Sequence, residues 1–201
     1  PAEGELGPRS KNWNAMPNDG FDNGQVLAMA AAGNDLFVGG YFARTADWSI
    51  GPLGNIARYD LASGTWHALP NAGLNAVVYA LAVSDGDLYV GGGFTGTGDG
   101  SLTDLNSIVR YDISANAWHA LPNRGLVGDT SQYAVHVLAV SGSDLYVGGL
   151  FLRSGAGLLT DLGNVARYRT ATRTWHPLPA NGLGGQVYAL AESGRSITAV
   201  V

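Results

Sequence analysis

The hydrophobic pattern of the chain consists of short apolar runs, each bounded by turn-forming residues such as Gly, Asp, Asn and Ser. In the run that begins at Val78, the bulky residues Tyr79 and Leu81 alternate with smaller apolar neighbours, so both faces are apolar. Alternation of this kind predicts a strand. Apolar residues on both faces predict that the sheet is covered on both sides.

Four such runs follow one another between residues 76 and 121 and predict an antiparallel meander. The expected strands are Val78–Val83, Leu88–Gly91, Ser107–Tyr111 and Ala117–Leu121. The connections after the first and third strands are very short, and the other two are long. In a four-stranded meander the two long connections leave from the same edge, so we expect all long loops on one face of the molecule.

The same four-strand unit occurs three times along the chain. Each copy has an apolar run that ends in Gly-Gly, then an Arg-Tyr pair, then a Trp seven positions after the Tyr. These Tyr and Trp residues are Tyr59 and Trp66, Tyr111 and Trp118, and Tyr168 and Trp175. A period near fifty residues predicts stacked sheet modules. Large-against-small packing between neighbouring modules favours a radial β-propeller.

With these motifs the chain resembles kelch-repeat proteins, of the type found at bacterial cell surfaces, from residue 13 to about residue 190. The resemblance implies an all-β fold, a β-propeller whose blades are four-stranded antiparallel meanders. Two features depart from the usual kelch pattern: a Trp-His-x-Leu-Pro run, and a fifteen-residue interval before the third strand. The WD40 alternative predicts Gly-His and Trp-Asp dipeptides, and the sequence contains neither.

The two ends of the chain match complementary halves of one further unit. Residues 186–201 repeat the first strand and begin a second, whereas residues 12–17 match the outermost strand. We therefore expect a single domain over residues 1–201, a monomeric ring of four blades. The expected blades are residues 24–69, 76–121 and 133–178, and a fourth that combines residues 186–201 with residues 1–17. The alternative is a fragment of a six- or seven-bladed propeller.

Composition excludes several classes of protein. The chain has no Cys, which excludes disulfides, thiolate catalysis and Cys-ligated zinc. A net charge of −5 without a basic stripe makes nucleic acid an unexpected partner. No apolar run approaches the ~20 residues of a membrane span. Because the chain opens on Pro1 without a signal-like segment, we expect a mature or excised soluble piece. The compartment stays open, with an extracellular or cell-surface location favoured.

Polar residues that recur in every repeat are interpreted as structural. Three His residues follow the repeat Trp on outer strands, where equivalent positions diverge far beyond the ~2 Å length of a metal–imidazole bond. Three Arg residues precede the repeat Tyr, and we expect each to pair with a neighbouring Asp or carbonyl. These residues are His67, His119 and His176, and Arg58, Arg110 and Arg167.

Residues that differ between repeats are the candidates for function. His136 replaces Leu27, Tyr79 and Tyr188 at the start of an inner strand, near the propeller axis on the long-loop face. The favoured interpretation of His136 is a core His bonded to a backbone carbonyl. The alternative, for which His136 is kept as a candidate ligand-binding residue, is a polar contact at the channel mouth with Tyr79 and Tyr188 as aromatic walls. Trp48 stands where the other repeats have Gly, and it predicts an exposed platform for sugars or peptide side chains, or a cover for the core.

One linker between blades is longer than the others. The extra residues are Val127–Ser131, which include Asp129 and Thr130. The insertion falls on the long-loop face, and loops on a rigid frame are where recognition residues collect. We therefore expect this segment to contact the ligand.

The long loops also carry carboxylates at Asp99, Asp104 and Asp161. The Gly96–Ser101 segment resembles a calcium loop, but it lacks the ligand rhythm of an EF-hand, so no cofactor is predicted and calcium remains an alternative. Glycoside hydrolysis needs two carboxyl groups about 5–10 Å apart, and no spacing here predicts them. We predict no catalytic residue. The expected function is a non-enzymatic binding module for a glycan or a protein or peptide ligand, with a propeller glycoside hydrolase as the alternative.

Overall fold

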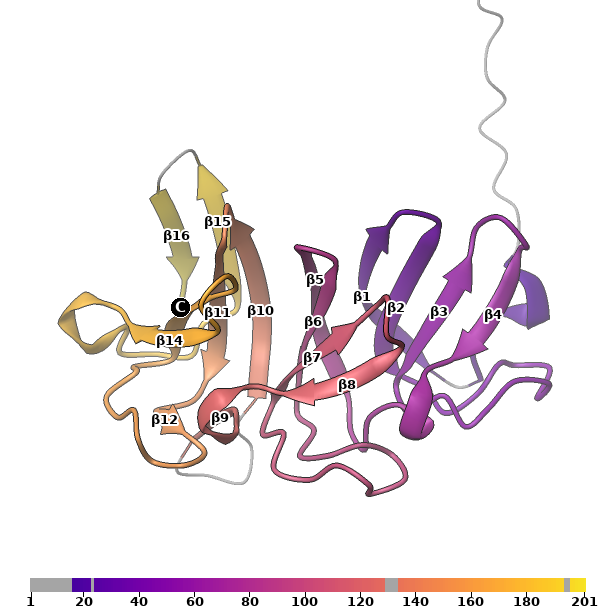
Figure 1. The fold of residues 1–201 in the computed structure, drawn as a ribbon, viewed down its shortest axis with the longest axis horizontal. Helices are drawn as coiled ribbons and strands as arrows, with labels where there is room; N and C mark the ends of the chain where they lie inside the picture. The colour runs from indigo at the N-terminus through magenta and orange to yellow at the C-terminus, as the bar shows by residue number, and fades with distance from the viewer. Residues whose placement is uncertain (1–15, 23, 129–133, 194–195) are drawn as a thin grey trace, which may run out of the picture.

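The computed structural model describes residues 16–22, 24–128, 134–193 and 196–201, and it shows an all-β fold of successive antiparallel sheets (Figure 1). Blade 1 contains β1 (Gln25–Ala32), β2 (Asp35–Tyr41), β3 (Ile56–Asp60) and β4 (Thr65–Ala68). Blade 2 contains β5 (Val78–Ser84), β6 (Asp87–Gly92), β7 (Ile108–Asp112) and β8 (Ala117–Ala120). Blade 3 contains β10 (Ala134–Ser141), β11 (Asp144–Leu150), β13 (Val165–Arg169) and β14 (Thr174–Pro177).

Shorter elements connect and follow these blades. A hairpin of β15 (Ala189–Ser193) and β16 (Ser196–Val200) begins a fourth unit. A two-residue pairing joins β9 (Leu126–Val127) to β12 (Arg153–Ser154) on the long-loop face. Single 3₁₀ turns follow β4, β8 and β14, namely η2 (Pro70–Ala72), η3 (Pro122–Arg124) and η4 (Pro179–Asn181), and an equivalent turn, η1 (Pro17–Asp19), precedes blade 1.

The meander predicted for each repeat is confirmed. Every complete blade pairs its strands in chain order, and the four strands of blade 2 begin and end within one residue of their expected positions. In Figure 1 the β1–β2, β3–β4 and β5–β6 hairpins lie toward the top and the long connections toward the bottom, so the long loops share one face as expected. None of the helices among the described residues is long and apolar enough to cross a membrane.

The blades are arranged around their first strands. The main contacts between blades run from β1 to β5, from β5 to β10, and from β10 to β15. In Figure 1 these inner strands stand side by side while the outer strands point away from them. The N-terminal half of the expected fourth blade, residues 1–15, lies outside the described residues. Closure into a four-bladed ring therefore stays a prediction.

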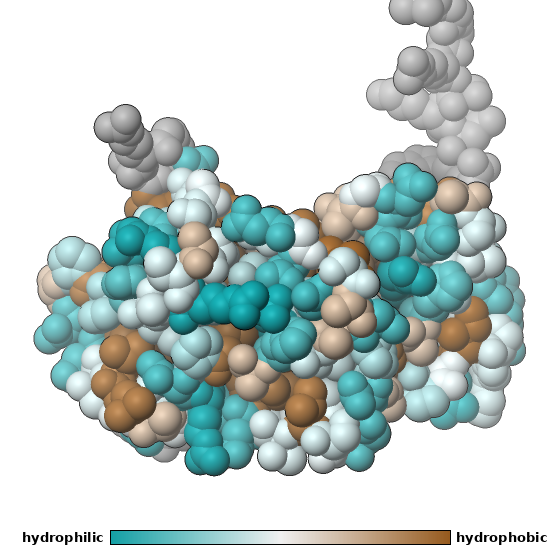
Figure 2. All heavy atoms as spheres, viewed as in Figure 1, coloured by the Kyte–Doolittle hydropathy of each residue, from teal (hydrophilic) through white to brown (hydrophobic). Residues whose placement is uncertain are grey.

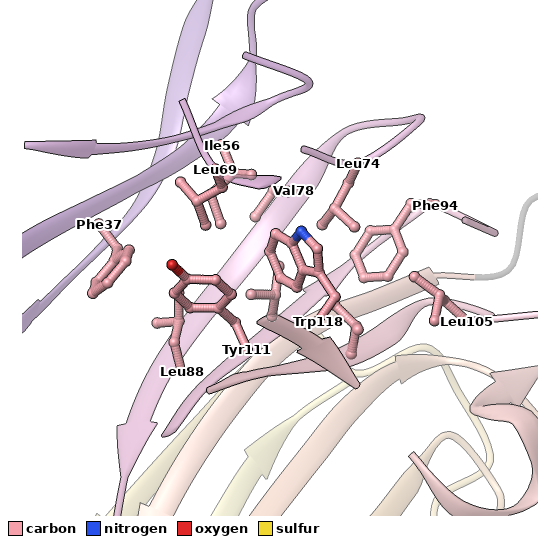
Figure 3. Packing of buried hydrophobic residues seen from close by; sticks show 12 residues of the cluster. Phe37, Ile56, Leu69, Leu74, Val78, Leu88, Phe94, Leu105, Tyr111 and Trp118 are labelled. Atoms are coloured by element: carbon pink, nitrogen blue, oxygen red, sulfur yellow. The ribbon is translucent and has the colours of Figure 1, made fainter. Parts of the chain in front are cut away.

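Hydrophobic side chains from two adjacent blades form the two larger core clusters, and a smaller cluster around Val38, Phe42 and Trp66 lies within blade 1. The cluster between blades 1 and 2 takes Phe37, Ile56 and Leu69 from blade 1, and these residues pack on Val78 and Trp118 of blade 2 (Figure 3). The next cluster repeats the arrangement with Tyr89, Ile108 and Leu121 from blade 2. The core thus lies mainly between blades, which is why both faces of each inner strand are apolar in sequence.

The Gly-Gly pair serves two different contacts. A Cβ on Gly91 would lie 2.5 Å from a methyl carbon of Val135 in blade 3, and one on Gly148 would lie 2.6 Å from Val187. In blade 1, Gly39 faces Val78 in the same way. The second Gly of each pair instead meets its own blade, since a Cβ on Gly92 would collide with the backbone carbonyl of Val77. The first Gly of each pair therefore admits the next blade, and the second admits the inner strand of its own blade.

The repeat Trp residues link each blade to the turn that ends the preceding one. The indole Nε1 of Trp118 donates a hydrogen bond to the carbonyl oxygen of Pro70 at 2.9 Å, and that of Trp175 donates to Pro122 at 3.1 Å. Trp66 donates in the same way to Pro17 at 3.2 Å. The three bonds explain why Trp and Pro recur in register.

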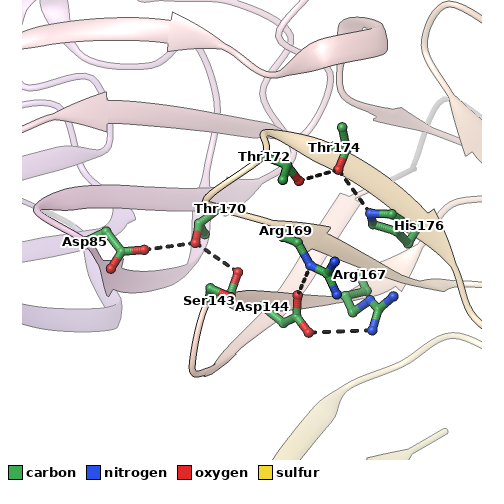
Figure 4. Close-up of polar contacts among 9 residues, drawn as sticks. All are labelled: Asp85, Ser143, Asp144, Arg167, Arg169, Thr170, Thr172, Thr174 and His176. Atoms are coloured by element: carbon green, nitrogen blue, oxygen red, sulfur yellow. Dashed lines mark hydrogen bonds and ion pairs between the residues drawn. The ribbon is translucent and has the colours of Figure 1, made fainter.

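The recurring Arg residues pair with Asp as predicted, and two of the three recurring His residues have a partner on their own strand. Arg58, Arg110 and Arg167 lie 3.5, 2.6 and 3.5 Å from the Asp that begins the neighbouring strand of the same blade. Figure 4 shows the blade 3 example, in which Asp144 binds both Arg167 and Arg169. His67 and His176 each contact a Thr two residues earlier on the outer strand, 3.0 Å away. On the short-turn face, the Thr170 hydroxyl donates to Asp85 of blade 2 at 2.9 Å (Figure 4).

Candidate functional site at the inner strands

Each complete inner strand contains a break in register near its start. The pairing skips one residue between Val26 and Ala28, between Val78 and Ala80, and between Val135 and Val137. The skipped residues are Leu27, Tyr79 and His136. A β-bulge of this kind re-aims a side chain away from the regular alternation of the strand. The sequence pattern placed these residues at the channel mouth but did not reveal the bulge.

The structure brings three of the predicted site residues together. The His136 ring lies 5.0 Å from that of Tyr79, edge to face, and 6.0 Å from that of Tyr188, nearly parallel at 10°. These residues come from three successive blades. Aromatic pairs prefer such offset-stacked and edge-to-face geometries. Their proximity agrees with the predicted arrangement of a His between two aromatic walls.

Gln186 completes the group and was missed by the sequence analysis. Its Nε2 lies 2.7 Å from Nδ1 of His136, and its Oε1 accepts a hydrogen bond from the Tyr188 hydroxyl at 3.1 Å. Gln186 stands where blades 2 and 3 have the apolar Val77 and Ala134. A polar residue at a position that is apolar in two other blades was the signal available in the sequence, although Gln25 occupies the same position in blade 1. We call Tyr79, His136, Gln186 and Tyr188 the inner-strand cluster.

Two features of the inner-strand cluster favour the neutral form of the His136 imidazole. Burial lowers the pKa of His136 below its ordinary value of 6.5, because a half-buried ring is poorly solvated in its charged form. A neutral ring also fits the contact with Gln186, since Nδ1 without a proton accepts from the amide nitrogen. The cluster therefore presents apolar ring surface together with amide, hydroxyl and imidazole groups.

The carboxylates of two long loops organise the loops themselves. Asp99 accepts hydrogen bonds from the Thr97 hydroxyl at 2.8 Å, from the amide and hydroxyl of Ser101 at 2.9 and 2.7 Å, and from Asn71 at 3.2 Å. Asp47 has the equivalent partners in blade 1. These donors hold the pKa of both carboxyl groups well below the usual range. Asp99 was predicted as a ligand-binding residue, and its contacts are those of a loop-ordering one.

Trp48 lies at the tip of the blade 1 loop and is 70% exposed. Its backbone has φ of 66°, the left-handed conformation that the equivalent Gly100 and Gly157 also adopt. The Arg44 guanidinium carbon lies 4.5 Å from the centre of its indole ring. Trp48 is thus an exposed platform rather than a cover for the core, and it lies in a different blade from every member of the inner-strand cluster.

Asp104 and Asp161 occupy equivalent positions with different surroundings. Asp104 forms an ion pair with Arg124 at 3.2 Å, whereas Asp161 borders a groove of about 370 Å³ beside Asn164, Asn181 and Leu183. A larger groove of about 560 Å³ lies between blades 1 and 2. Its lining includes Asp22, Tyr41, Asn55 and Asn75, none of which the sequence analysis selected.

The predicted insertion is only partly visible. Val127 belongs to β9 and pairs with Arg153 of the blade 3 loop. Asp129 and Thr130 lie outside the described residues, so their predicted contact with a ligand stays a prediction. Within the described part of the chain, no group of three or more His, Cys, Asp or Glu side chains is placed to hold a metal ion.

Comparison with known proteins now bears on these features. The family model of the kelch motif matches residues 79–125, from the bulged Tyr79 through the outer strand of blade 2 to its terminal turn. Blade 2 of this chain therefore contains a kelch motif. The other blades repeat the register and strand pairing of this segment, and Trp66 and Trp175 repeat the Trp-to-Pro contact of Trp118.

Three relatives have longer sequences than this chain. Polarized growth protein L1 of Phoma sp. is 29% identical over 177 residues, which are 86% of this chain and 12% of that protein. Polarized growth protein rax2 of Schizosaccharomyces pombe is 33% identical over 48% of this chain and 8% of its own length. The human kelch repeat and BTB domain-containing protein 13 is 33% identical over 53% of this chain and 22% of its own. The chain thus spans about a fifth or less of these relatives, and the bacterial cell-surface type of repeat stays a prediction.

Solved structures show the same fold at low sequence identity. The computationally designed Ika4 protein aligns over 88% of this chain and 85% of its own, with 17% identity and a TM-score of 0.52. The extracellular domain of the putative hybrid two component system BT4673 from B. thetaiotaomicron aligns over 87% of this chain and 19% of its own, with 18% identity and a TM-score of 0.58. The β-propeller architecture predicted for these kelch repeats is therefore confirmed.

Proposed function

We propose that this kelch propeller domain is a non-enzymatic binding module that takes a glycan at the inner-strand cluster. Kelch propeller domains typically serve as binding modules. The observation that carries the proposal is the cluster itself: a His between two Tyr rings, with a Gln amide bonded to both the His and one Tyr. Sugars present apolar ring faces and hydroxyl groups, and such a cluster offers aromatic surface together with hydrogen-bonding groups.

Exposure supports this location. Tyr188 is 63% exposed, and Tyr79 and His136 are half-buried, so the cluster combines ordered rings with accessible surface. Binding sites consist mainly of apolar and aromatic side chains with a few polar groups that fix orientation. The hydrogen bonds of Gln186 hold the rings before a ligand arrives, which reduces the entropy that binding would otherwise lose.

A protein or peptide ligand is the second candidate, supported by the tips of the long loops. Trp48 and Leu158 are 70% and 74% exposed at neighbouring positions of equivalent loops. Hydrophobic residues appear along the lower part of Figure 2, where the long loops lie in Figure 1, below a hydrophilic band. Exposed apolar residues with a polar surround are typical of protein contact sites.

The loop carboxylates give less support to a glycoside hydrolase. Its general acid needs a raised pKa, so that one carboxyl group remains protonated at working pH. Asp47 and Asp99 have lowered pKa values, because Ser and Thr donors stabilise their charged forms. A loop-ordering role is therefore favoured over acid catalysis at these positions.

The test is a glycan array and a peptide library screened with the 201-residue chain, followed by titration calorimetry of the best binder. We expect a glycan to bind, and the variants Tyr188→Ala and Gln186→Leu to weaken it at least about tenfold, since each removes a ring or the bonds that hold it. Ser114→Ala, in the short-turn hairpin of blade 2, is the matched control and should bind normally. Unchanged binding in both cluster variants would reject the proposed site, and selective binding of peptides would favour the second candidate.

A further inference from the structure

One face of blade 1 points away from blade 2, and we call it the outer face of blade 1. This face is apolar, and none of the other described blades covers it. Val26 is 46% exposed, whereas its equivalents Val78, Val135 and Val187 are fully buried. Met29, on the same strand, is 64% exposed. An apolar groove of about 300 Å³ lies here, lined by residues that include Phe21, Val38 and Trp66. The groove coincides with the surface that, on blade 2, is covered by blade 1.

The other junctions show what such a face receives. At the two junctions between complete blades, the inner strand receives an aromatic residue from the second strand of the preceding blade, an Ile from its third strand and a Leu before its Pro turn. Each also brings a Gly whose missing side chain makes room for the inner-strand Val. The second strand therefore reads aromatic-Val-Gly-Gly, as in Phe37–Gly40 and Tyr89–Gly92.

Blade 1 already holds the last part of such a preceding blade. Trp66 donates to the Pro17 carbonyl oxygen just as Trp118 donates to Pro70. Phe21 pairs with Thr45 as Leu74 pairs with Thr97. The η1 turn and Phe21 therefore occupy the positions that η2 and Leu74 occupy at the next junction.

The C-terminal hairpin does not offer the matching strand. Through the pairing of Ala189 with Val200, Val200 occupies the position that Gly39, Gly91 and Gly148 hold in the other blades. Thr198 stands in place of the aromatic residue. A branched side chain at the Gly position would meet Val26 instead of making room for it. A second copy of the chain does not supply the matching strand either, because its Phe37 and Tyr89 are buried in their own junctions between blades.

We propose that the outer face of blade 1 is an interaction surface for one further blade of the same repeat, which precedes blade 1 and presents an aromatic-Val-Gly-Gly second strand to Val26 and Met29. This arrangement corresponds to the larger propeller rather than to a four-bladed ring closed by β15 and β16. The continuity of three equivalent junctions and the docked η1 turn supply the register.

An in-register duplication tests the proposal within the full chain. A second copy of residues 73–124 is inserted between Asp19 and Gly20, so that Pro17–Asp19 precedes the new Gly73 and the copied Arg124 precedes Gly20. Because the chain has no Cys, Val26→Cys gives a single thiol whose alkylation rate reports cover on this face. We expect the duplication to slow alkylation of this thiol at least about tenfold, since the thiol then reacts through opening of the junction.

Two controls show whether slow alkylation depends on the aromatic-Val-Gly-Gly strand and whether it is specific to the outer face of blade 1. Replacing Tyr89 by Thr and Gly91 by Val in the inserted copy imitates β16 and should restore fast alkylation. A thiol placed instead by Val200→Cys should stay equally reactive with or without the insertion.

Fast alkylation of the Val26→Cys thiol in the duplicated chain would overturn the proposal. Slow alkylation of the same thiol in the chain without the insertion would also overturn it. In that case a monomer by light scattering would show closure by the chain itself, and a dimer would show pairing with a second copy.

Discussion

The inner strands of blade 1 and blade 2 have nearly the same sequence motif in opposite environments. The strand of blade 2 is covered by a neighbouring blade, whereas that of blade 1 is exposed on the outer face of blade 1. Val78 has no exposed surface because blade 1 covers it, whereas the equivalent Val26 is 46% exposed. The strands themselves pair in the same way, including the bulge. The difference shows that a blade of this chain forms its own hydrogen bonds but depends on its neighbours for its core. Stability should therefore be a property of junctions, as in other repeat proteins.

The strongest test of this difference is an added side chain inside a junction. We expect Gly91→Val to destabilise the chain by roughly 3 kcal/mol or more, because the new methyl groups would overlap Val135 of blade 3. Gly92→Val should cost at least as much, since its Cβ collides with the Val77 carbonyl. Urea unfolding followed by circular dichroism measures both.

Gly100→Ala is the matched loop control for these variants. A Cβ there has open space, so the expected cost is about 1 kcal/mol and comes from the positive φ of 72°. Equal unfolding midpoints for the three variants would contradict the assignment of the Gly-Gly pair to close packing.

A smaller effect comes from removing side-chain volume at equivalent positions. Val78→Ala leaves a cavity between two blades and should cost about 2 kcal/mol, whereas Val26→Ala on the open face should cost less than about 0.5 kcal/mol. The comparison uses the same substitution in the same strand position, so intrinsic strand preference cancels. Similar losses of unfolding free energy in both variants would mean that the outer face of blade 1 is covered in solution.

The Trp-to-Pro contacts allow the covered junction and the open end to be compared through a single hydrogen bond. Trp118→Phe keeps most of the ring but removes the donor to the Pro70 carbonyl, and we expect a loss of about 1 kcal/mol. Trp66→Phe removes the equivalent bond to Pro17 at the open end. A clearly smaller loss there would show that the η1 turn is held less firmly than η2. Chemical unfolding of both variants, monitored by far-ultraviolet circular dichroism, gives the values.

The smallest expected effect is a pH dependence of stability that comes from His136 in blade 3 and has no counterpart at the equivalent position of blade 2. Since burial lowers the pKa of His136 in the folded chain, the unfolded chain takes up the proton first as the pH falls. The contribution of His136 to stability is therefore complete above about pH 6.5 and declines below it. His136→Tyr installs the residue that blade 2 has at this position and should flatten the dependence between pH 7 and pH 5. Melting temperatures measured across that interval test it, and parallel profiles for the two proteins would contradict the role of His136.

Repeated residues made most of the fold predictable. Three copies of the Gly-Gly, Tyr and Trp motif fixed the strand order, and the short and long connections fixed the face of the loops. The partner of Trp118 was not predictable, because nothing in the sequence connects an indole nitrogen with the carbonyl of a Pro 48 residues earlier. Likewise, the alternation of apolar residues does not reveal a bulge at Tyr79, which depends on how two strands pair.

The candidate site was predictable only where a residue departed from its repeat. His136 differs from the hydrophobic and aromatic residues at its equivalent positions, and this marked the inner-strand cluster before any geometry was known. Gln186 shares its residue type with Gln25 and so gave a weaker signal. Asp99 was selected for its charge alone, yet its oxygens accept from Thr97, Ser101 and Asn71. A carboxylate in a polar loop orders the loop as readily as it binds a ligand.

The Trp-to-Pro hydrogen bonds also give the chain a direction during synthesis. In each pair the Pro carbonyl is made first, and its Trp donor follows 48 to 53 residues later. At ribosomal speeds this separation corresponds to roughly 3–10 s, in which the finished turn has no indole to bind. Each blade therefore gains its Trp-to-Pro hydrogen bond only when the outer strand of the next blade leaves the ribosome. During synthesis the newest blade of the growing chain always lacks this bond.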